Sequence, residues 1–585
     1  MAKSLLEALK AAQEKAGFQL IKPKPEQQPI TKNPSRQKNA TGTDVAVRTD
    51  RNTGVAGKQS VPHSRAKKRR QKKPGRQQSP APSKEPPVWN NPRRPTAMLP
   101  PNPAPAPEVR LVFNGSPRLA WKPSPVDSSL LLERDQSLGS EDRLSRSSGT
   151  DRELIMGIDF GTSSTKVVIS DRVLDTAYAV PFLDVASIDG YLLPSRLAEI
   201  DGVFTLAKGD TVYRDLKLSM LAFPEQDERC IRVCAFLALV IRSARAWLFG
   251  DYAVQYQSVA PLWSLALGQP ADHATSKDSR MLFDRLGKVA WHLANQRGDI
   301  RRDICTAAWK KAKDGLPDED VEILVMPELT AQIHGFVSSS HFNPGATNIY
   351  LLCDVGAGTV DASVFRVERT PSGSNRFKFF THCVESHGVM NLHRHRVDWW
   401  DEQLGAQATG ASVRGELDTI RLPTEYGGHT PACFSHYFEG VKAEFLGSMK
   451  TPDEDYFRSK VVYQVKGRVL YRLWNAGYLD QQNITGMPFF LCGGGARHPI
   501  YTNLKNEMQH QPNCTWLSAQ HRALVQPPNL QAPGLGNADF DRLSVAYGLS
   551  QLDLDSVTQI SPLTPLVACG TESNWCENYV DKDVC

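Results

Sequence analysis

Apolar and polar positions alternate in a regular way along residues 151–585, and the pattern predicts strands joined by short polar turns. The run Leu154–Ile169, LIMGIDFGTSSTKVVI, places two apolar segments on either side of a Gly-Thr-Ser-Ser turn and predicts a buried hairpin. Ile349–Val367, IYLLCDVGAGTVDASVFRV, repeats the pattern around a Gly-Ala-Gly-Thr turn. In Pro488–Tyr501, PFFLCGGGARHPIY, an apolar strand runs into three glycines and then a helix.

Helical patterns lie between these strands. Arg229–Phe249 is predicted to be a long apolar helix, and Asp278–Ala294 an amphipathic one. Val321–Val325 is typical of a buried strand, and the helix that follows is expected to begin near Glu328. This mixture of strands and helices predicts an α/β fold, and the second Asp-containing hairpin indicates an internal duplication.

The first 150 residues have a different composition. They carry 28 Lys+Arg against 12 Asp+Glu and 20 of the 40 prolines, so the rest of the +6 chain has a net charge of −10. We expect a largely disordered N-terminal tail, because such a segment cannot bury enough apolar surface to offset its ordering entropy. A short amphipathic helix at 3–16 would either dock on a partner or form transiently without a role.

Three further segments of the tail suggest contacts. The basic block Arg65–Lys73, RAKKRRQKK, is expected either to bind nucleic acid or another polyanion, or to be a solvated charge run. Pro80–Pro107 is typical of an extended spacer or of a ligand for a groove-type module. Val109–Trp121 alternates like a hairpin around Asn114-Gly115, which would fold onto the body or act as a recognition segment.

The 11 cysteines include no CxxC pair, and Cys230 and Cys234 are expected to be buried thiols on one helix face. The apolar residues near the start are interrupted by charges, unlike a signal peptide. The longest apolar run, Ala235–Ile241, is too short to span a bilayer. We therefore expect a cytoplasmic protein without membrane contact.

The turns of the two hairpins carry residue types that suit a phosphate ligand. A backbone can approach a ligand closely at Gly161, and the Thr and Ser residues that follow offer hydroxyl and N–H donors. Asp159 and Asp354 each end an apolar strand, where a carboxylate can hold a hydrated metal ion. We interpret the two turns as facing one phosphate chain, with the triple glycine leaving room for a flat ring.

These segments resemble, in order and spacing, the phosphate and adenosine motifs of the actin-like ATPase superfamily. The closest likeness is to the nucleotide-binding domain of DnaK-type heat-shock chaperones: GIDFGTSST resembles GIDLGTTNS, DVGAGTVDASVF resembles DLGGGTFDVSIL, and CGGGARHPIY resembles VGGSTRIPKI. MPELTAQIHGF and LSVAYG are similar to two helices of that family, so the resemblance covers about 154–554. It implies a two-lobed α/β fold with duplicated RNase H-like sheets and ATP with Mg²⁺ in the cleft.

The resemblance also implies boundaries within the chain. Lobe I would be 151–345 with a small insert at about 206–262, and lobe II 346–540 with an insert at about 391–486. A closing helix of lobe I at 541–556 and a C-terminal tail at 557–585 would follow.

Roles for individual residues follow from the same resemblance. Asp159 and Asp354 would hold the hydrated Mg²⁺, while Glu328, Asp354 and Asp361 would lie around the attacking water and Lys217 would be the catalytic lysine. The nucleotide would be contacted by Gly161, Thr162, Ser163, Gly356, Ala357, Gly358, Thr359, Lys442, Gly493, Gly494, Gly495 and Arg497.

The chain also departs from the family. Ala357 replaces a glycine, Gly495 replaces a serine, and only about 30 residues follow Leu554, which leaves no room for a client-binding domain. We therefore predict a slow Mg-dependent ATPase that binds ATP or ADP and acts as a nucleotide-driven switch for a protein partner. An ATP-binding scaffold with little turnover, an actin-like filament former and a sugar kinase of the same superfamily are the alternatives.

Overall fold

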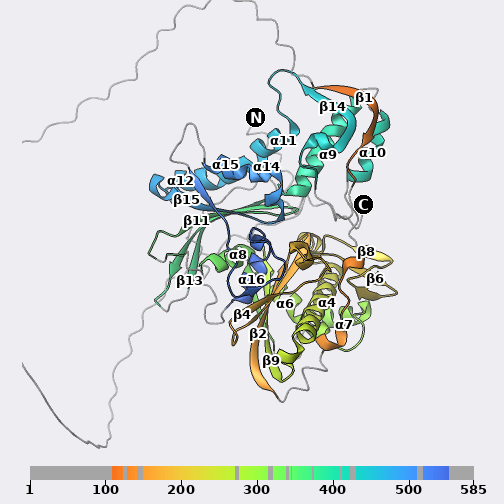
Figure 1. Cartoon of the computed structure of the whole chain (residues 1–585), viewed down its shortest axis with the longest axis vertical. Helices are drawn as coiled ribbons and strands as arrows, with labels where there is room; N and C mark the ends of the chain where they lie inside the picture. Colours follow the sequence, from red (N-terminus) through yellow and green to blue (C-terminus); the bar gives the residue numbers. More distant parts are fainter. Residues whose placement is uncertain are drawn as a thin grey trace, which may run out of the picture. The chain divides into compact units, whose positions relative to one another are not determined.

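The computed structural model describes residues 109–122, 128–140, 149–270, 276–313, 321–337, 342–343, 345–371, 375–406, 411–421, 430–509 and 518–552. All of them belong to the second of two compact units of the chain, residues 97–585. The helix expected at 3–16, the basic block at 65–73, the proline-rich stretch at 80–107 and the tail at 557–585 lie outside the described residues. The described part is a mixed α/β fold, as predicted (Figure 1).

The larger sheet has the strand order β10-β9-β2-β3-β4-β17, with the short β5 also paired to β3. β2 and β3 form the hairpin predicted at 154–169, β4 continues antiparallel to β3, and β9 and β10 run parallel to β2. The strands are β2 (Thr150–Phe160), β3 (Ser164–Asp171), β4 (Thr176–Ala179), β5 (Leu193–Pro194), β9 (Val259–Gln269), β10 (Glu322–Pro327) and β17 (Leu530–Gln531).

The second sheet has the order β13-β12-β11-β15-β16. β11, β12 and β13 form an antiparallel meander, and β15 and β16 run parallel to β11. The strands are β11 (Ile349–Val355), β12 (Val360–Arg369), β13 (Asn375–Glu385), β15 (Met487–Cys492) and β16 (Ala519–Arg522). Both sheets thus flank the first strand of a meander with two parallel strands, which is the arrangement that an internal duplication predicts.

Each sheet is covered on both faces, because alternate side chains of its strands enter different apolar clusters. In β3, Val167 packs into the cluster of the first sheet's own helices, whereas Val168 enters a cluster that also contains Leu352 of β11 and Phe490 of β15. We call this second cluster, to which both sheets contribute, the shared core.

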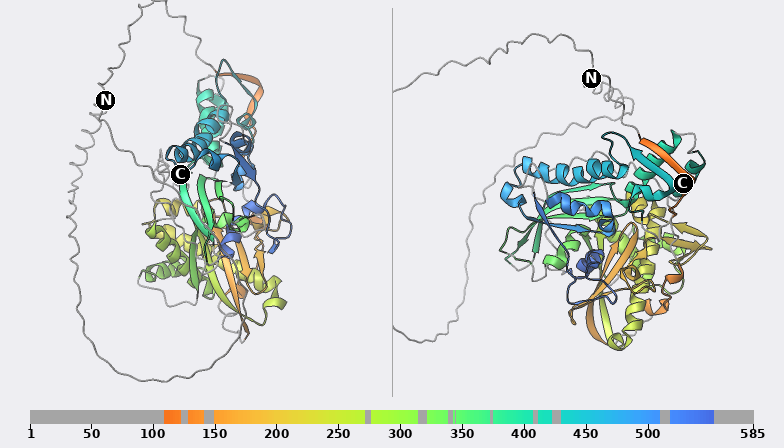
Figure 2. Two further views of the ribbon diagram at one scale, coloured as in Figure 1. Left: turned by 90° about the vertical axis from the view of Figure 1, so that its left-hand side faces the viewer. Right: turned by 45° about the horizontal axis from the view of Figure 1, so that its top comes forward.

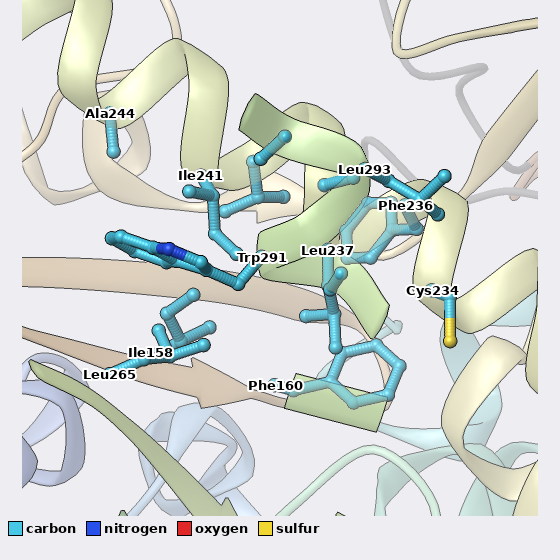
Figure 3. Close-up of a cluster of buried hydrophobic side chains, with 14 of the residues drawn as sticks. Ile158, Phe160, Cys234, Phe236, Leu237, Ile241, Ala244, Leu265, Trp291 and Leu293 are labelled. Carbon is cyan, nitrogen blue, oxygen red and sulfur yellow. The ribbon is translucent and has the colours of Figure 1, made fainter. Parts of the chain in front are cut away.

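Helix α4 (Asp227–Asp251) lies at the centre of the first sheet's own core. With α6 (Lys277–Asn295) and α7 (Arg302–Lys311) it packs on β2 and β9, and Figure 3 shows Ile158 and Phe160 of β2 facing Phe236, Leu237 and Trp291 of these helices. Among the described helices, only α4 is long and apolar enough to cross a membrane, but 89% of its apolar window is buried inside the protein, as in a core helix of a soluble protein. Cys230 and Cys234 are buried on it with free thiols, as predicted.

The sequence places a small insert at 206–262, but α4 and the start of β9 fall within that range and belong to the core. A separate three-stranded sheet lies nearby instead, formed by β6 (Leu197–Ile200), β7 (Val203–Thr205) and β8 (Thr211–Tyr213). Helix α4 is apolar along its length because it is buried on both sides. The sequence pattern alone does not show whether such a helix belongs to the core or to an insert.

Helices α8 (Glu328–Val337) and α16 (Ser544–Ser550) fill the shared core. They cross in direct backbone contact at Gly548, where a Cβ atom would overlap the carbonyl oxygen of Ala331. A Cβ at Gly157 of β2 would likewise overlap the carbonyl oxygen of Ala546, so α16 also lies directly on β2. Glycine is required at both positions because no side chain fits between the backbones.

The hairpin expected at Val109–Trp121 is wrong, because the segment forms the single strand β1 (Val109–Leu119), antiparallel to β14 (Phe438–Phe445). Residues 114–117 bulge out between Phe113 and Arg118, opposite Gly440. The Asn-Gly pair therefore makes a bulge and not a reversal, since β14 offers both halves of β1 a longer apolar partner. Figure 2 shows β1 beside β14, so the segment does fold onto the body.

β1, β14, α9 (Val389–Gly405) and α10 (Ala411–Arg421) enclose a separate apolar cluster, which we call the β1–β14 unit. It accounts for the first part of the insert expected at 391–486. The π-helical segment η7 (Phe457–Tyr471) does not belong to it, because Val461 and Val465 pack on the second sheet. The remaining helices are α3 (Leu216–Ala222), α5 (Ala253–Tyr256), α11 (Pro452–Tyr456), α12 (Arg472–Asn475), α13 (Gln481–Ile484), α14 (Pro499–Thr502) and α15 (Leu504–Gln509).

The predicted tail is also ordered at 128–140. The Arg134 guanidinium donates to the carbonyl oxygens of Pro181 and Ser243, and Gln136 Nε2 donates to Ser243 Oγ at 3.3 Å. Gly139 lies against the carbonyl of Arg242 in α4. Residues 136–139 thus pack on α4, and Thr150, the last residue of the predicted tail, starts β2.

We predict that Gly548→Ala lowers the free energy of unfolding by about 3 kcal/mol, because the new methyl group must separate α8 from α16. The matched control is Gly415→Ala in α10, where no atom lies within 4 Å of the added Cβ. That variant should be stabilised by about 0.5–1 kcal/mol through helix propensity. Urea unfolding of both variants measures the difference, and equal midpoints would contradict the close crossing.

Candidate functional site

The first loop, residues 161–164, follows β2 and carries the predicted phosphate-binding hydroxyls. Thr162 is half-buried and Ser163 is exposed, so both can be reached by a ligand. Ser195 holds the loop through two hydrogen bonds: its Oγ donates to Gly161 O at 2.7 Å, and its N–H donates to Ser163 O at 3.1 Å. Ser195 has no sequence signal, because it comes from a separate segment after β5.

Asp159 lies just before this loop and is paired across the hairpin with Lys166. Lys166 Nζ is 2.9 Å from Asp159 Oδ2, and their side chains are only 12% and 9% exposed. Lys166 was not predicted from the sequence. The hairpin pattern could have identified it, because a short turn places Lys166 opposite Asp159 on the neighbouring strand.

The second loop, residues 356–359, is held by the start of α9. The N–H groups of Val389 and Met390 donate to the carbonyls of Gly356 and Ala357 at 3.2 and 2.8 Å, and Asn391 Nδ2 donates to Gly358 O at 2.6 Å. With its carbonyls turned toward α9, the loop keeps the N–H groups of Ala357, Gly358 and Thr359 without an acceptor among the described residues. Three free N–H donors on adjacent residues form a cradle suited to an anion.

Asp354 and Asp361 lie opposite each other in the register of β11 and β12, so their side chains are on one face of the sheet. Gln332 Nε2, from α8, donates to Asp354 Oδ2 at 2.7 Å. Burial raises the pKa of Asp354 to about 6, Gln332 opposes this rise, and the charges of Asp159 and Glu328 add to it. Gln332 is a further residue that the sequence reading missed.

Lys217 and Glu328 form a close ion pair between α3 and the first residue of α8. Burial alone would lower the pKa of Lys217, but the contact with Glu328 and the nearby charges of Asp159 and Asp361 raise it, so the ammonium stays charged. Burial raises the pKa of Glu328, and Lys217 opposes this rise. Asp215 precedes Lys217 in a left-handed conformation (φ 49°), a strained backbone that starts α3 at this point.

These contacts bring the predicted residues of three segments together. The charges of Asp159 from β2 and Glu328 from α8 both raise the pKa of Asp354 from β11, and the charge of Lys166 opposes them. Asp159 and Glu328 also act on the pKa of Lys217. Residues far apart in sequence thus form one buried, highly charged cluster.

The third loop, Gly493–Gly495, packs directly on the second. At Gly493 (φ 87°) a Cβ atom would overlap Asp354 Oδ1. At Gly495 it would lie 2.6 Å from both Val355 Cγ1 and Val389 Cγ2. Glycine at position 495, where the resembling motif has serine, therefore has a packing reason, because two valine side chains occupy the space that a hydroxymethyl group would need.

Arg497, expected to contact the nucleotide, is held in place by carboxylates. Its Nη2 is 2.7 Å from Asp541 Oδ1 and 3.0 Å from Asp539 Oδ1, and its Nη1 donates to Asp541 Oδ2 at 3.1 Å. The guanidinium also reaches Gly493 O at 3.3 Å. These contacts fix Arg497 as a link between the third loop and the chain that leads into α16.

Lys442 is placed apart from these groups. It lies on β14 of the β1–β14 unit with its side chain 71% exposed, and its ion pair is with Glu444, at 3.7 Å. Within the described part of the chain no contact joins it to the three loops, so its role near the nucleoside stays a prediction.

Comparison with known proteins adds no relative. No protein-family model matches this chain, and no curated protein matches it. The assignment of the site therefore depends on its residues and their geometry.

The donor set suits a hydrated cation next to an anion. Among the described residues no group of three or more His, Cys, Asp or Glu side chains is arranged to hold a metal ion directly. Mg²⁺ keeps several of its waters and takes one or two carboxylates. Asp159 and Asp354 therefore fit a hydrated Mg²⁺, and the N–H groups of the second loop, which lack an acceptor among the described residues, fit the anion.

Gly495→Ser tests the packing reason for glycine at this position of the third loop. We predict a loss of about 1–3 kcal/mol in unfolding free energy, because the new side chain collides with two valines. Adding Val389→Ala should recover part of this loss, and a double-mutant cycle on thermal unfolding measures the coupling. Independent, additive effects of the two substitutions would contradict the packing explanation.

Proposed function

We propose that the described body adopts the two-lobed actin-like ATPase fold and binds ATP or ADP with Mg²⁺. One observation carries the proposal: five strands of the first sheet, β4-β3-β2-β9-β10, have the same order and directions as the second sheet, β13-β12-β11-β15-β16, and each sheet has an aspartate near the end of its first strand, before a glycine loop. Asp159 and Asp354 occupy the same place in the two hairpins, each seven residues before its cross-strand partner, Lys166 or Asp361. Two related halves that present equivalent carboxylates and donor-rich loops suit a ligand with a chain of phosphates.

In this proposal the first and second loops bind the phosphates. The hydroxyls of Thr162 and Ser163 and the N–H groups of residues 357–359 donate to phosphate oxygens. Asp159 and Asp354 would hold the hydrated Mg²⁺, which supplies charge neutralisation for the terminal phosphate.

The remaining residues act on the attacking water and the charge that develops. Glu328 and Asp361 orient the water through their carboxylates, and the charged Lys217 stabilises the negative charge on the transferred phosphoryl group. Since phosphoryl transfer depends mainly on positioning and charge stabilisation, these side chains suffice for slow hydrolysis.

Because the two sheets share one core, a nucleotide held between their loops could change how they close on each other. We therefore propose a nucleotide-driven switch that acts on a protein partner. The β1–β14 unit is a candidate partner surface, since it lies outside both large sheets and, within the described residues, each of its two strands has one edge without a neighbouring strand.

One observation favours a second function, an ATP-binding scaffold with little turnover. Lys166 Nζ, 2.9 Å from Asp159 Oδ2, competes with a metal ion for this carboxylate. If Lys166 keeps that position with nucleotide bound, Mg²⁺ is held less firmly and hydrolysis is slower.

We predict that the purified chain hydrolyses ATP slowly and that Asp354→Asn and Lys217→Ala each reduce turnover at least about 100-fold while ADP binding is retained. The matched control is Lys288→Ala on α6, where Lys288 is 51% exposed and pairs with Asp284. Phosphate release and isothermal titration calorimetry measure the two properties.

Because Lys217→Ala leaves Glu328 without its partner, the double variant Lys217→Ala/Glu328→Gln is the folding control. A wild-type chain that binds ATP without turning it over supports the scaffold instead. A chain that binds no adenine nucleotide contradicts the proposed fold family's site as a whole.

A further inference from the structure

A second arginine, Arg542, lies against the third loop. An ideal Cβ at Gly494 would be 3.1 Å from Arg542 Cζ, 3.3 Å from Nη2 and 3.4 Å from Nη1. Cζ is the nearest of the three atoms, so the guanidinium presents its flat face, and not its edge, to Gly494. Glycine at this position leaves the space that the guanidinium fills.

The N–H donors of Arg542 have no acceptor within the part of the chain that the structure describes. Within the described residues its guanidinium makes no side-chain hydrogen bond and no ion pair, although the side chain is half-buried. Arg497, its neighbour on the same loop, binds two carboxylates and two carbonyls. Burial lowers the pKa of Arg542, and the positive charge of Arg497 adds to this effect.

The backbone that carries Arg542 is fixed. It is the last residue of η9 (Phe540–Arg542), and its N–H donates to Asp539 O at 3.0 Å. Helix α16, which comes next in the chain, packs directly on β2. The charge of Asp541 acts on the pKa of Arg542 in the opposite sense to burial, as do those of Asp189 in the segment before β5 and of Asp159 in β2. Arg542 thus lies between Asp159, which precedes the first loop, and the glycines of the third loop.

Within the described residues the half-buried guanidinium has no acceptor, and its nitrogen atoms stay accessible to water, so an incoming ligand can reach them. One face already lies on Gly494, so stacking of a base on the other face would still leave the in-plane N–H groups unpaired. Phosphate oxygens match these donors in charge and geometry. The neighbouring Arg497 cannot supply the same contact, because its donors are bound to Asp539 and Asp541.

We propose that Arg542 is a nucleotide-binding residue that donates to the phosphate chain, and that Arg497 is a positioning residue for the third loop. This inference rests on the proposed function, because it takes the bound ligand to be an adenine nucleotide. The contact with the phosphates is thereby assigned to an arginine that lies outside the motif in which Arg497 was predicted to contact the nucleotide.

The test compares ADP with adenosine, with Mg²⁺ present throughout, by isothermal titration calorimetry on the full chain. Arg542→Ala should weaken ADP binding about 10- to 100-fold and leave adenosine binding unchanged, because only ADP carries the phosphates. Arg497→Ala should weaken both ligands by the same factor. Arg522→Ala, an exposed arginine on β16, is the control and should bind both ligands like the wild type.

Arg542→Gln repeats the test with a side chain of similar length and no charge, in case Arg542→Ala does not fold. Unchanged ADP affinity in a folded Arg542 variant would overturn the proposal. Equal weakening of ADP and adenosine would also overturn it, since the contact would then be to the nucleoside. A wild-type chain that binds neither ligand would instead overturn the proposed function and this assignment with it.

Discussion

The backbone contact between α8 and α16 determines where the groups of the candidate site lie. Gly548 meets the carbonyl of Ala331 in this crossing, and Gly157 lets α16 rest on β2. Glu328 begins α8, Gln332 lies one turn later, and Arg542 immediately precedes the chain that enters α16. A larger residue at the crossing would move all three relative to Asp159 at the end of β2. The separation of α8 and α16 therefore sets how far these three side chains lie from Asp159.

The charged cluster explains why so many of the surrounding contacts are polar. Carboxylates and ammonium groups lose hydration when they are buried, and only close pairing offsets that loss. Lys166 pairs with Asp159, Lys217 with Glu328, and Gln332 with Asp354. Several donors around this cluster have no acceptor among the described residues, including the N–H groups of the second loop and the Arg542 guanidinium. A ligand that brings oxygen acceptors would form hydrogen bonds with these donors, and the phosphates of the proposed nucleotide are such a ligand.

The hairpins were predictable because each is a local pattern: an apolar run, a short glycine turn and a second apolar run. The same local reasoning was wrong at 109–121, where the better partner of the strand lies more than 300 residues away in β14. Lys166, Ser195, Gln332 and Arg542 escaped prediction for a related reason. Each is an ordinary residue within its own segment and becomes significant only through contact with another segment. For Arg497 the motif predicted a contact with the nucleotide, which stays a prediction, and the structure adds its ion pairs with Asp539 and Asp541.

The sequence by itself determined the α/β class, the two matching hairpins with their terminal aspartates, and the start of α8 at Glu328. These depend on apolar periodicity and turn chemistry, which act over a few residues. Only the tertiary structure decided which residues meet: the shared strand order of the two sheets, the pairing of β1 with β14, and the free donors beside the third loop. Such contacts join segments hundreds of residues apart, and their geometry depends on how whole elements pack, which no local pattern encodes.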